Sequence, residues 1–241
     1  MPRTLSRLLP RPGERAMSEK RWVTFDCFGT LVDWRHGIAT GIELVAPGKG
    51  WELLDVYNRH EPQVQREHPS MRYSDVLTEA LKRTAIEAEI DLLEDDTRVL
   101  TAGIPFWPVF PETRQALREL RESGWNLALL TNCDRVIIGE TQRRLRVQFD
   151  AVVTAEDSGA YKPAHHHFEY FEKSLGVTRD RWVHVAQSYF HDMVPAGELD
   201  IARVWINRLH ASDDPSIAHA VRPDLSDLAA TVNEVHQKLT G

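Results

Sequence analysis

The chain has 241 residues, of which 42% are hydrophobic and 27% charged, and its formal net charge is -7. This balance is typical of a globular protein that forms one large domain, or a core domain with an insertion. The acidic charge argues against a nucleic-acid partner, and no apolar run approaches the ~20 residues of a membrane span. Two cysteines, Cys27 and Cys133, make no disulfide framework and fit a reducing cytoplasm. For both, packing is favoured over a redox role.

The first twenty residues differ from the rest. Four arginines recur there among prolines and a glycine, and Pro10 and Pro12 would break a helix. The segment lacks the apolar core of a secretory signal. We therefore predict a disordered basic extension over 1–20, with Met17 as an alternative start.

A buried strand is predicted from Trp22 to Phe25, because this run is apolar and rich in β-branched and aromatic residues. It is followed by Asp26 and then by the turn residues Gly29 and Thr30. A carboxylate at the carboxyl end of a buried strand lies where open α/β sheets place their chemistry. The alternative is that Asp26 only caps the next helix.

The stretch from 36 to 104 has no strand signal and reads as helical. Apolar residues recur at helical spacing in four places, and one helix is predicted from Tyr73 to Ile90 with Ser74 as its N-cap. We expect an all-helical cap domain at 36–104, inserted after the first strand.

From residue 111 onwards, helices and strands alternate. The expected strands cover 125–130, 149–154, 182–186 and 202–206, and the expected helices cover 112–122, 135–146, 164–175, a short stretch after Asp192 and the tail from 224. Such alternation indicates an α/β fold with a doubly wound, Rossmann-like parallel sheet. The core domain would comprise 21–35 and 105–241.

Four segments at predicted strand ends together resemble the motifs of the haloacid dehalogenase (HAD) superfamily. They are Asp26-Cys27-Phe28-Gly29-Thr30-Leu31, Leu129-Leu130-Thr131-Asn132, Tyr161-Lys162-Pro163 and Ala186-Gln187-Ser188-Tyr189-Phe190-His191-Asp192. The resemblance covers about 22 to 207, and the helical insertion resembles the superfamily's cap.

The resemblance implies catalytic roles for six residues. Asp26 would be the nucleophile, oriented by Thr30 and Thr131, and Asn132 would donate to the leaving group or substrate. Lys162 and Asp192 would set the charge of the site and position water. Taken alone, Asn132 reads as a turn residue and Lys162 as a surface residue.

Phe28 decides between branches of the superfamily. Phosphatases usually carry a second Asp there, as the acid for an alkoxide leaving group, whereas a halide needs no proton. Phe28 therefore favours the L-2-haloacid dehalogenase branch, with hydrolysis of a small 2-haloalkanoic acid to a 2-hydroxy acid through an Asp26 ester and no required cofactor. Gln187 and Tyr189 depart from the serine and asparagine usual in that branch.

Substrate contacts are expected from Phe28, Trp34, Tyr57, Asn58, Arg59, Ser188 and Tyr189. Trp34, with Arg35, either lines the pocket or holds the cap hinge. Enzymes of this branch bind substrate and halide with a cap arginine, but the matching place here holds Asn58, with Arg59 beside it. Arg35, Arg66 or Arg72 are alternatives.

Two further functions stay open. One is a phosphatase acting on a good leaving group, with Mg²⁺ held by Asp26 and Asp192. The other is a non-catalytic HAD-fold binding protein. His165-His166-His167 is read as the start of a solvent-facing helix rather than a metal site. The expected partner is a short haloacid, and similar enzymes suggest a homodimer.

Overall fold

A six-stranded parallel sheet forms the centre of the protein. The computed structural model describes residues 20–241, so nearly all of the predicted N-terminal extension and Met17 lie outside the described residues. The strand order is β3-β2-β1-β4-β5-β6, which confirms the predicted doubly wound sheet. The strands are β1 (Trp22–Phe25), β2 (Asn126–Thr131), β3 (Ala151–Thr154), β4 (Trp182–Ala186), β5 (Ala202–Ile206) and β6 (Ala220–Arg222). The sequence analysis missed β6, which has only three residues, all half-buried, at the sheet edge.

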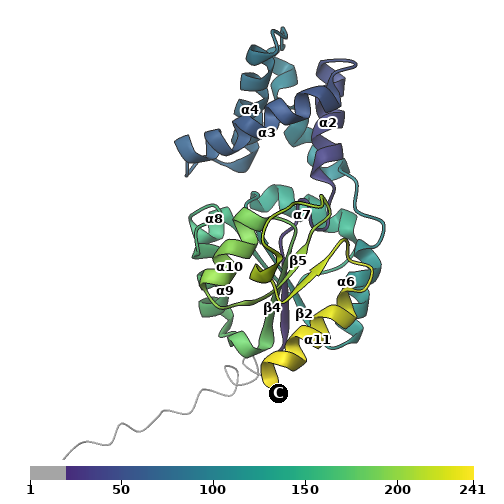
Figure 1. Ribbon diagram of the computed structural model, residues 1–241. Helices are drawn as coiled ribbons and strands as arrows, with labels where there is room; N and C mark the ends of the chain where they lie inside the picture. Colours follow the sequence, from purple (N-terminus) through teal and green to yellow (C-terminus); the bar gives the residue numbers. More distant parts are fainter. Residues whose placement is uncertain (1–19) are drawn as a thin grey trace, which may run out of the picture.

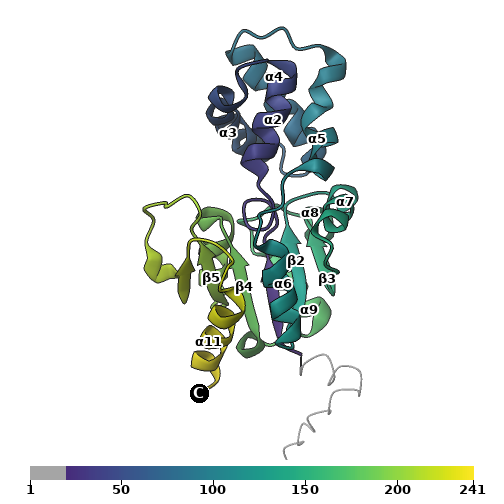
Figure 2. The same ribbon diagram turned by 90° about the vertical axis from the view of Figure 1, so that its right-hand side faces the viewer.

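Helices cover both faces of this sheet (Figures 1 and 2). One face packs against α6 (Thr113–Glu122), α7 (Arg135–Leu145) and α11 (Leu228–Thr240). The other packs against α9 (His166–Leu175) and α10 (Val194–Glu198), with α8 (Ala155–Ser158) beside α9. Short single turns, η3 (Arg179–Arg181), η4 (Tyr189–Met193) and η5 (Pro215–Ile217), complete the connections. Asp192 lies inside η4, and the short helix predicted to follow it is α10.

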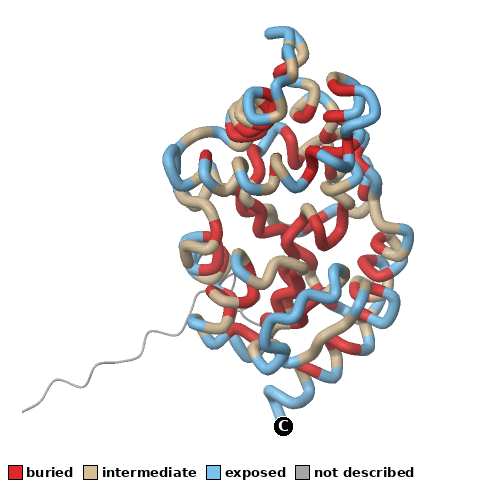
Figure 3. The backbone as a smooth tube through the Cα atoms, turned by 45° about the horizontal axis from the view of Figure 1, so that its top comes forward, coloured by how far each residue is buried: buried red, intermediate tan, exposed pale blue. Residues whose placement is uncertain are grey.

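The central strands are buried along their whole length (Figure 3). Their side chains alternate between the two faces, so both faces must be apolar. On the face covered by α9, Trp22 and Trp182 pack against Phe171 with ring centroids 5.3 Å and 5.1 Å away. This packing holds β1 and β4 rigidly side by side, and their carboxyl ends carry the site described below.

A helical unit lies above the carboxyl edge of the sheet (Figure 1). It contains α2 (Trp34–Val45), α3 (Gly50–Glu67), α4 (Tyr73–Glu87), η1 (Glu94–Arg98), α5 (Val99–Gly103) and η2 (Ile104–Phe106). The predicted helical insertion after the first strand is thus confirmed. Helix α4, predicted to run from Tyr73 to Ile90, begins at Tyr73 and ends at Glu87, three residues earlier than predicted.

The chain enters and leaves the insertion through two adjacent segments. Asp33 N donates to Pro108 O at 2.8 Å, and Phe110 N donates to Leu31 O at 3.2 Å. On the insertion side, Gly37 lies directly against the Trp107 ring, where a Cβ would come within 2.3 Å of ring carbon. Only glycine permits this approach, so the two segments are tied together at the base of the cap.

A second connection joins the core to the start of α4. The two carboxylate oxygens of Asp134, in the loop after β2, accept hydrogen bonds from Tyr73 N and Ser74 N, each at 2.9 Å. Ser74 was predicted to be the N-cap, which is wrong: the N-cap is Arg72, and no side chain of the helix itself caps it. Asp134 lies 60 residues further along the sequence and accepts from the free N–H groups of the first turn of α4. Its negative charge also interacts favourably with the positive end of the helix dipole.

Asp134→Ala is expected to lower the free energy of unfolding by about 1–2 kcal/mol, because two backbone N–H groups at the core–cap junction lose their acceptor. Asp134→Asn keeps one acceptor oxygen and should lie between the wild type and Asp134→Ala. Urea unfolding followed by tryptophan fluorescence measures the difference. Equal stability of Asp134→Ala and the wild type would show that this contact does not hold the cap.

Candidate active site

Asp26 lies at the carboxyl end of β1, the strand flanked by β2 and β4 in the middle of the sheet. Its backbone N–H donates to Val185 O at 3.2 Å, which continues the pairing of β1 with β4. Oδ2 accepts a hydrogen bond from Thr30 Oγ1 at 3.2 Å, and Thr30 Oγ1 accepts from Gln187 N at 2.9 Å. The Asp26 carboxylate is thus held in one orientation, with 8% of the residue exposed.

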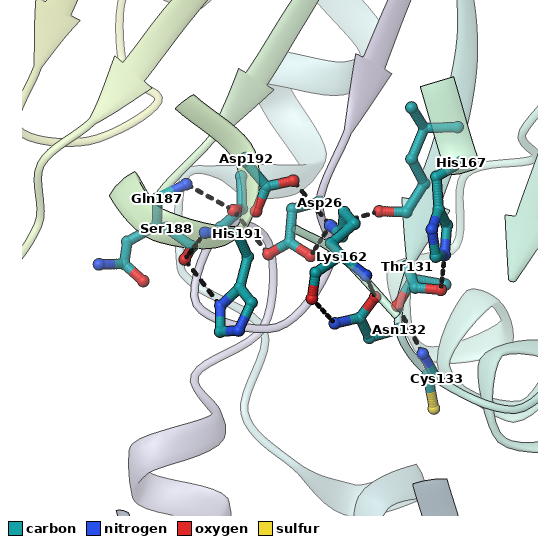
Figure 4. A network of polar contacts seen from close by, with 12 residues as sticks. Asp26, Thr131, Asn132, Cys133, Lys162, His167, Gln187, Ser188, His191 and Asp192 are labelled. Carbon is teal, nitrogen blue, oxygen red and sulfur yellow. Dashed lines mark hydrogen bonds and ion pairs between the residues drawn. The ribbon is translucent and has the colours of Figure 1, made fainter. Parts of the chain in front are cut away.

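Lys162 bridges the two buried carboxylates of the site (Figure 4). Its Nζ donates to Asp26 Oδ1 at 2.9 Å, to Asp192 Oδ1 at 2.7 Å and to Leu130 O at 2.8 Å, which uses all three N–H bonds. Burial lowers the pKa of Lys162, but the charges of Asp192 and Asp26 outweigh it and raise that pKa above its ordinary value. The pKa of Asp26 is raised by burial and by the charge of Asp192, against the opposing effect of Lys162.

Asp192 is held by a buried chain of hydrogen bonds that starts at Trp182, the first residue of β4. Trp182 Nε1 donates to Thr24 Oγ1 at 2.7 Å, Thr24 Oγ1 lies 2.9 Å from His184 Nδ1, and His184 Nε2 lies 3.1 Å from Asp192 Oδ1. The indole can only donate, so Thr24 Oγ1 accepts from it and the hydroxyl hydrogen is free to point at Nδ1, while His184 Nε2–H faces the Asp192 carboxylate, which can only accept. Against the effect of burial, Lys162 and His184 lower the pKa of Asp192 to about 2.

Thr24→Val is expected to cost about 1–3 kcal/mol of stability and to lower turnover, because Trp182 Nε1 and His184 Nδ1 both lose a buried partner. Thr24→Ser keeps the hydroxyl and is the matched control. Thermal unfolding and initial rates of the two variants measure the effect. A Thr24→Val protein as stable and as active as Thr24→Ser would show that the chain does not support Asp192.

Asn132 and Thr131 occupy the end of β2 beside this network. Asn132 Oδ1 accepts from Lys162 N at 2.7 Å, and Asn132 Nδ2 donates to Lys162 O at 3.2 Å. The amide therefore fixes the backbone that carries the lysine. Thr131 Oγ1 accepts from Cys133 N at 3.3 Å, and within residues 20–241 no hydrogen bond joins it to Asp26.

A cavity of about 320 Å³ opens above Asp26, between the core and the cap. Of the predicted residues, it brings together Asp26, Phe28, Trp34, Tyr57, Asn58, Thr131, Asn132, Lys162, Ser188 and Asp192. Thr30 lies behind the lining and contacts two lining residues, Asp26 and Gln187. Sequence analysis missed Ile38, Glu61, Pro62, Gln65, Tyr73, Cys133, Gln187, His191 and Leu209 as lining residues. The i, i+4 spacing of Tyr57 and Glu61 was the available signal for the cap side.

Two predicted substrate contacts lie elsewhere. Arg59 is on another side of α3 from Tyr57, where it is exposed and pairs with Glu87 of α4. Tyr189 packs against Trp205, with ring centroids 5.3 Å apart, and does not line the cavity. Among the described residues that line the cavity, none is an arginine, so Arg35, Arg66 and Arg72 do not replace Arg59 there.

Phe28, Trp34, Ser188 and His191 also line the cavity. Phe28 packs edge-on against Trp107 at 5.4 Å and gives the floor an apolar surface. Trp34 begins α2 and lines the cavity, and Arg35 lines a second cavity beside the start of α2; a hinge role for this pair stays a prediction. Ser188 Oγ lies 3.1 Å from His191 Nδ1, and burial lowers the pKa of His191, which keeps the imidazole neutral near pH 7.

Both cysteines and one histidine of the run 165–167 are buried. Burial raises the pKa of both Cys27 and Cys133 well above its ordinary value, which suppresses the reactive thiolate and favours a packing role. The prediction of a solvent-facing histidine run is wrong for His167, which is fully buried with Nε2 3.0 Å from Thr131 O. Among residues 20–241, no cluster of three metal-ligating side chains occurs.

Comparison with known proteins identifies the family. The model of the haloacid dehalogenase-like hydrolases matches residues 20–188, more than half of the chain. The chain belongs to the haloacid dehalogenase-like hydrolase family. Within the described residues, no helix of this hydrolase has the length and apolar character needed to cross a membrane.

Individual relatives confirm the resemblance to the L-2-haloacid dehalogenase branch. Haloacetate dehalogenase H-2 of Moraxella sp. (strain B) is 28% identical over 77% of this chain and 85% of its own length. An (S)-2-haloacid dehalogenase of Pseudomonas putida is 25% identical over 86% of this chain and 94% of its own. The L-2-haloacid dehalogenase of Xanthobacter autotrophicus with chloropropionic acid covalently bound superposes with a TM-score of 0.76, at 20% identity, over 89% of this chain and 98% of that one.

Proposed function

We propose that this hydrolase removes halide from a short 2-haloalkanoic acid and releases the 2-hydroxy acid. The observation that carries the proposal is that the Asp26 carboxylate is held in one orientation and has the apolar side chain of Phe28 beside it in the cavity. Asp26 is held by Lys162 and Thr30 at the floor of the cavity, and Phe28 stands two residues on, where an acid for an alkoxide leaving group would be needed.

In the first step, a carboxylate oxygen of Asp26 attacks C2 of the substrate. The C–O bond forms as the carbon–halogen bond breaks, and the halide leaves with the bonding electron pair, so no proton is required. The products are an ester of Asp26 with inverted C2 and a free halide. Lys162 balances the charge of Asp192 throughout and keeps the attacking carboxylate in place.

In the second step, water attacks the ester carbonyl carbon of Asp26. The Asp192 Oδ2 atom is buried beside the cavity, has no hydrogen-bond partner in the described part of the chain, and is suited to accept a hydrogen bond from that water. Collapse of the tetrahedral intermediate regenerates the Asp26 carboxylate and releases the 2-hydroxy acid; of the two protons of the water, one passes to the departing alkoxide oxygen and the other passes to solvent. His191, neutral and lining the same cavity, is a route for that proton.

The same unpartnered Asp192 Oδ2 favours a second candidate, an Mg²⁺-dependent phosphatase. Asp192 and Asp26 supply two carboxylates, and Mg²⁺ commonly takes one or two carboxylates with water and substrate oxygens as its remaining ligands. The bound ion would neutralise charge on phosphoryl oxygens. Phe28 restricts this candidate to phosphates with a good leaving group.

One assay separates the candidates. The protein is incubated with 2-chloropropanoate, fluoroacetate and p-nitrophenyl phosphate, with and without EDTA, and halide and phosphate are measured. Halide release that is unchanged by EDTA is the expected result. Phosphate release that EDTA abolishes, without halide release, would favour the phosphatase. No turnover of any of the three would favour a non-catalytic binding protein.

A further inference from the structure

The cap wall of the cavity is formed mainly by one face of α3. Tyr57, Glu61 and Gln65 follow at intervals of four residues and line the cavity together with Asn58. Residues at this spacing lie in a row on one side of a helix. The row carries a hydroxyl, a carboxyl and an amide, Asn58 beside it adds a second amide, and within the described part of the chain no lysine or arginine of the cap joins them.

The Tyr57 hydroxyl finds no hydrogen-bond partner among residues 20–241. The residue is 1% exposed, yet its Oη is unpaired within that range while Tyr57 lines the cavity. A buried hydroxyl without a partner costs about 1–3 kcal/mol, and a bound ligand would remove that cost. This atom is the observation that points to a ligand at the cap wall.

Glu61, one turn further along the helix, complements Tyr57. It accepts hydrogen bonds from Gln65 Nε2 and from Tyr73, and a carboxylate has lone pairs left for further donors. Burial raises its pKa to about 7. The cap wall therefore offers a donor and an acceptor four residues apart on the helix, which together match a group that both accepts and donates.

The charges around the cavity restrict what that group can be. Among the described residues, three carboxyl groups line the cavity, those of Asp26, Glu61 and Asp192, and the ammonium of Lys162 is used by Asp26 and Asp192. An anionic group at the cap wall would be repelled by Glu61 once that carboxyl is ionised, and a purely apolar group would leave Tyr57 unpartnered. An uncharged hydroxyl avoids both costs.

From this arrangement we infer that the preferred substrates are 2-haloacids with a hydroxyl group on C3, which Tyr57 and Glu61 bind at the cap wall. The inference rests on the proposed dehalogenase function and specifies its substrate class. The C3 hydroxyl would accept from Tyr57 Oη and donate to the Glu61 carboxylate.

Two nearly isosteric substrates test the inference. We expect kcat/KM for (S)-2-chloro-3-hydroxypropanoate to exceed that for (S)-2-chlorobutanoate by about 10- to 100-fold, as expected for one or two buried hydrogen bonds. The ratio should fall towards 1 in Tyr57→Phe, and it should fall part of the way in Glu61→Gln, whose amide oxygen still accepts but is a weaker acceptor than a carboxylate. Glu52→Gln, an exposed position on the same helix, should keep the wild-type ratio. A wild-type ratio of 1 or below, or an unchanged ratio in both pocket variants, would overturn the inference.

A binding measurement separates this inference from the proposed function. Calorimetry compares glycerate with 2-hydroxybutanoate, the corresponding product pair, on wild type, Tyr57→Phe and Glu61→Gln. Tighter binding of glycerate that Tyr57→Phe loses and Glu61→Gln weakens supports the hydroxyl site, even where no halide is released and the dehalogenase proposal fails. If halide is released but the two products bind equally, the dehalogenase proposal stands and the hydroxyl site is overturned. Failure to bind glycerate would also overturn the hydroxyl site.

Discussion

Asp26→Asn is expected to lower halide release from 2-chloropropanoate by about 10⁴-fold or more, because the amide is a poor nucleophile and no other group takes its place. The substitution preserves the shape of the side chain, and its oxygen still accepts from Thr30 Oγ1, which now lies 3.2 Å from Asp26 Oδ2. The variant should therefore fold and bind substrate. Initial rates, with circular dichroism to check the fold, measure the effect.

The control for this prediction is Asp33→Asn. Asp33 caps α2 beside the active-site turn but does not line the catalytic cavity, so its substitution should change halide release far less. Activity in freshly prepared Asp26→Asn within tenfold of the wild type would reject Asp26 as the nucleophile.

Lys162→Met is expected to have the largest effect on stability. The lysine is 2% exposed and pairs with two carboxylates, so its removal leaves Asp26 and Asp192 buried beside one another without a counter-charge. Breaking a buried ion pair in this way costs about 3–5 kcal/mol. The pKa of Asp26 should rise further, so halide release near neutral pH should also be lost. Denaturant unfolding near pH 7 measures the stability.

The chain offers matched controls for Lys162→Met. Lys82 pairs with Glu94 at 3.4 Å on the surface, and Lys82→Met should change stability by less than about 1 kcal/mol. Adding Asp192→Asn to Lys162→Met removes one of the two unpaired charges and should recover part of the lost stability. A Lys162→Met protein no less stable than Lys82→Met would contradict the account of the buried charges.

The catalytic floor was predictable from the sequence because its residues follow strand ends. Asp26, Thr131 and Asn132 each follow a recognisable apolar strand, and parallel strands bring their carboxyl ends to one edge. Lys162 comes from the loop between α8 and α9 and Asp192 from η4, both at this edge, and the resemblance to the superfamily motifs identified them. The fold class followed for the same reason, since alternating strand and helix patterns leave few topologies.

The cap wall was less predictable, since it depends on which face of a helix meets the core. Tyr57 and Glu61 share a face of α3 that only tertiary packing turns toward Asp26, and Arg59, two residues from each, points to Glu87 instead. The contacts of Asp134 with Tyr73 and Ser74 span 60 residues, and no local pattern announces them. His167 was misread because its partner, Thr131 O, is a backbone atom of a distant strand.

The cap arginine is where this chain departs most from the enzymes it resembles. The sequence analysis expected a cation near Asn58, but the structure has Tyr57, Asn58 and Glu61 at the cavity. These side chains provide hydrogen bonds without a positive charge. The departing halide would therefore rely on neutral donors, and substrates with an additional polar group would gain most from this wall.

The covalent role of Asp26 is tested most directly by isotope transfer. A single turnover of excess enzyme with 2-chloropropanoate is run in H₂¹⁸O, and the product and the peptide containing Asp26 are examined by mass spectrometry. Since water attacks the ester carbonyl of Asp26, we predict ¹⁸O in the Asp26 carboxylate and ¹⁶O in the new hydroxyl of the lactate. Lactate labelled with ¹⁸O from the first turnover, with unlabelled Asp26, would show direct attack of water on C2 and contradict this mechanism.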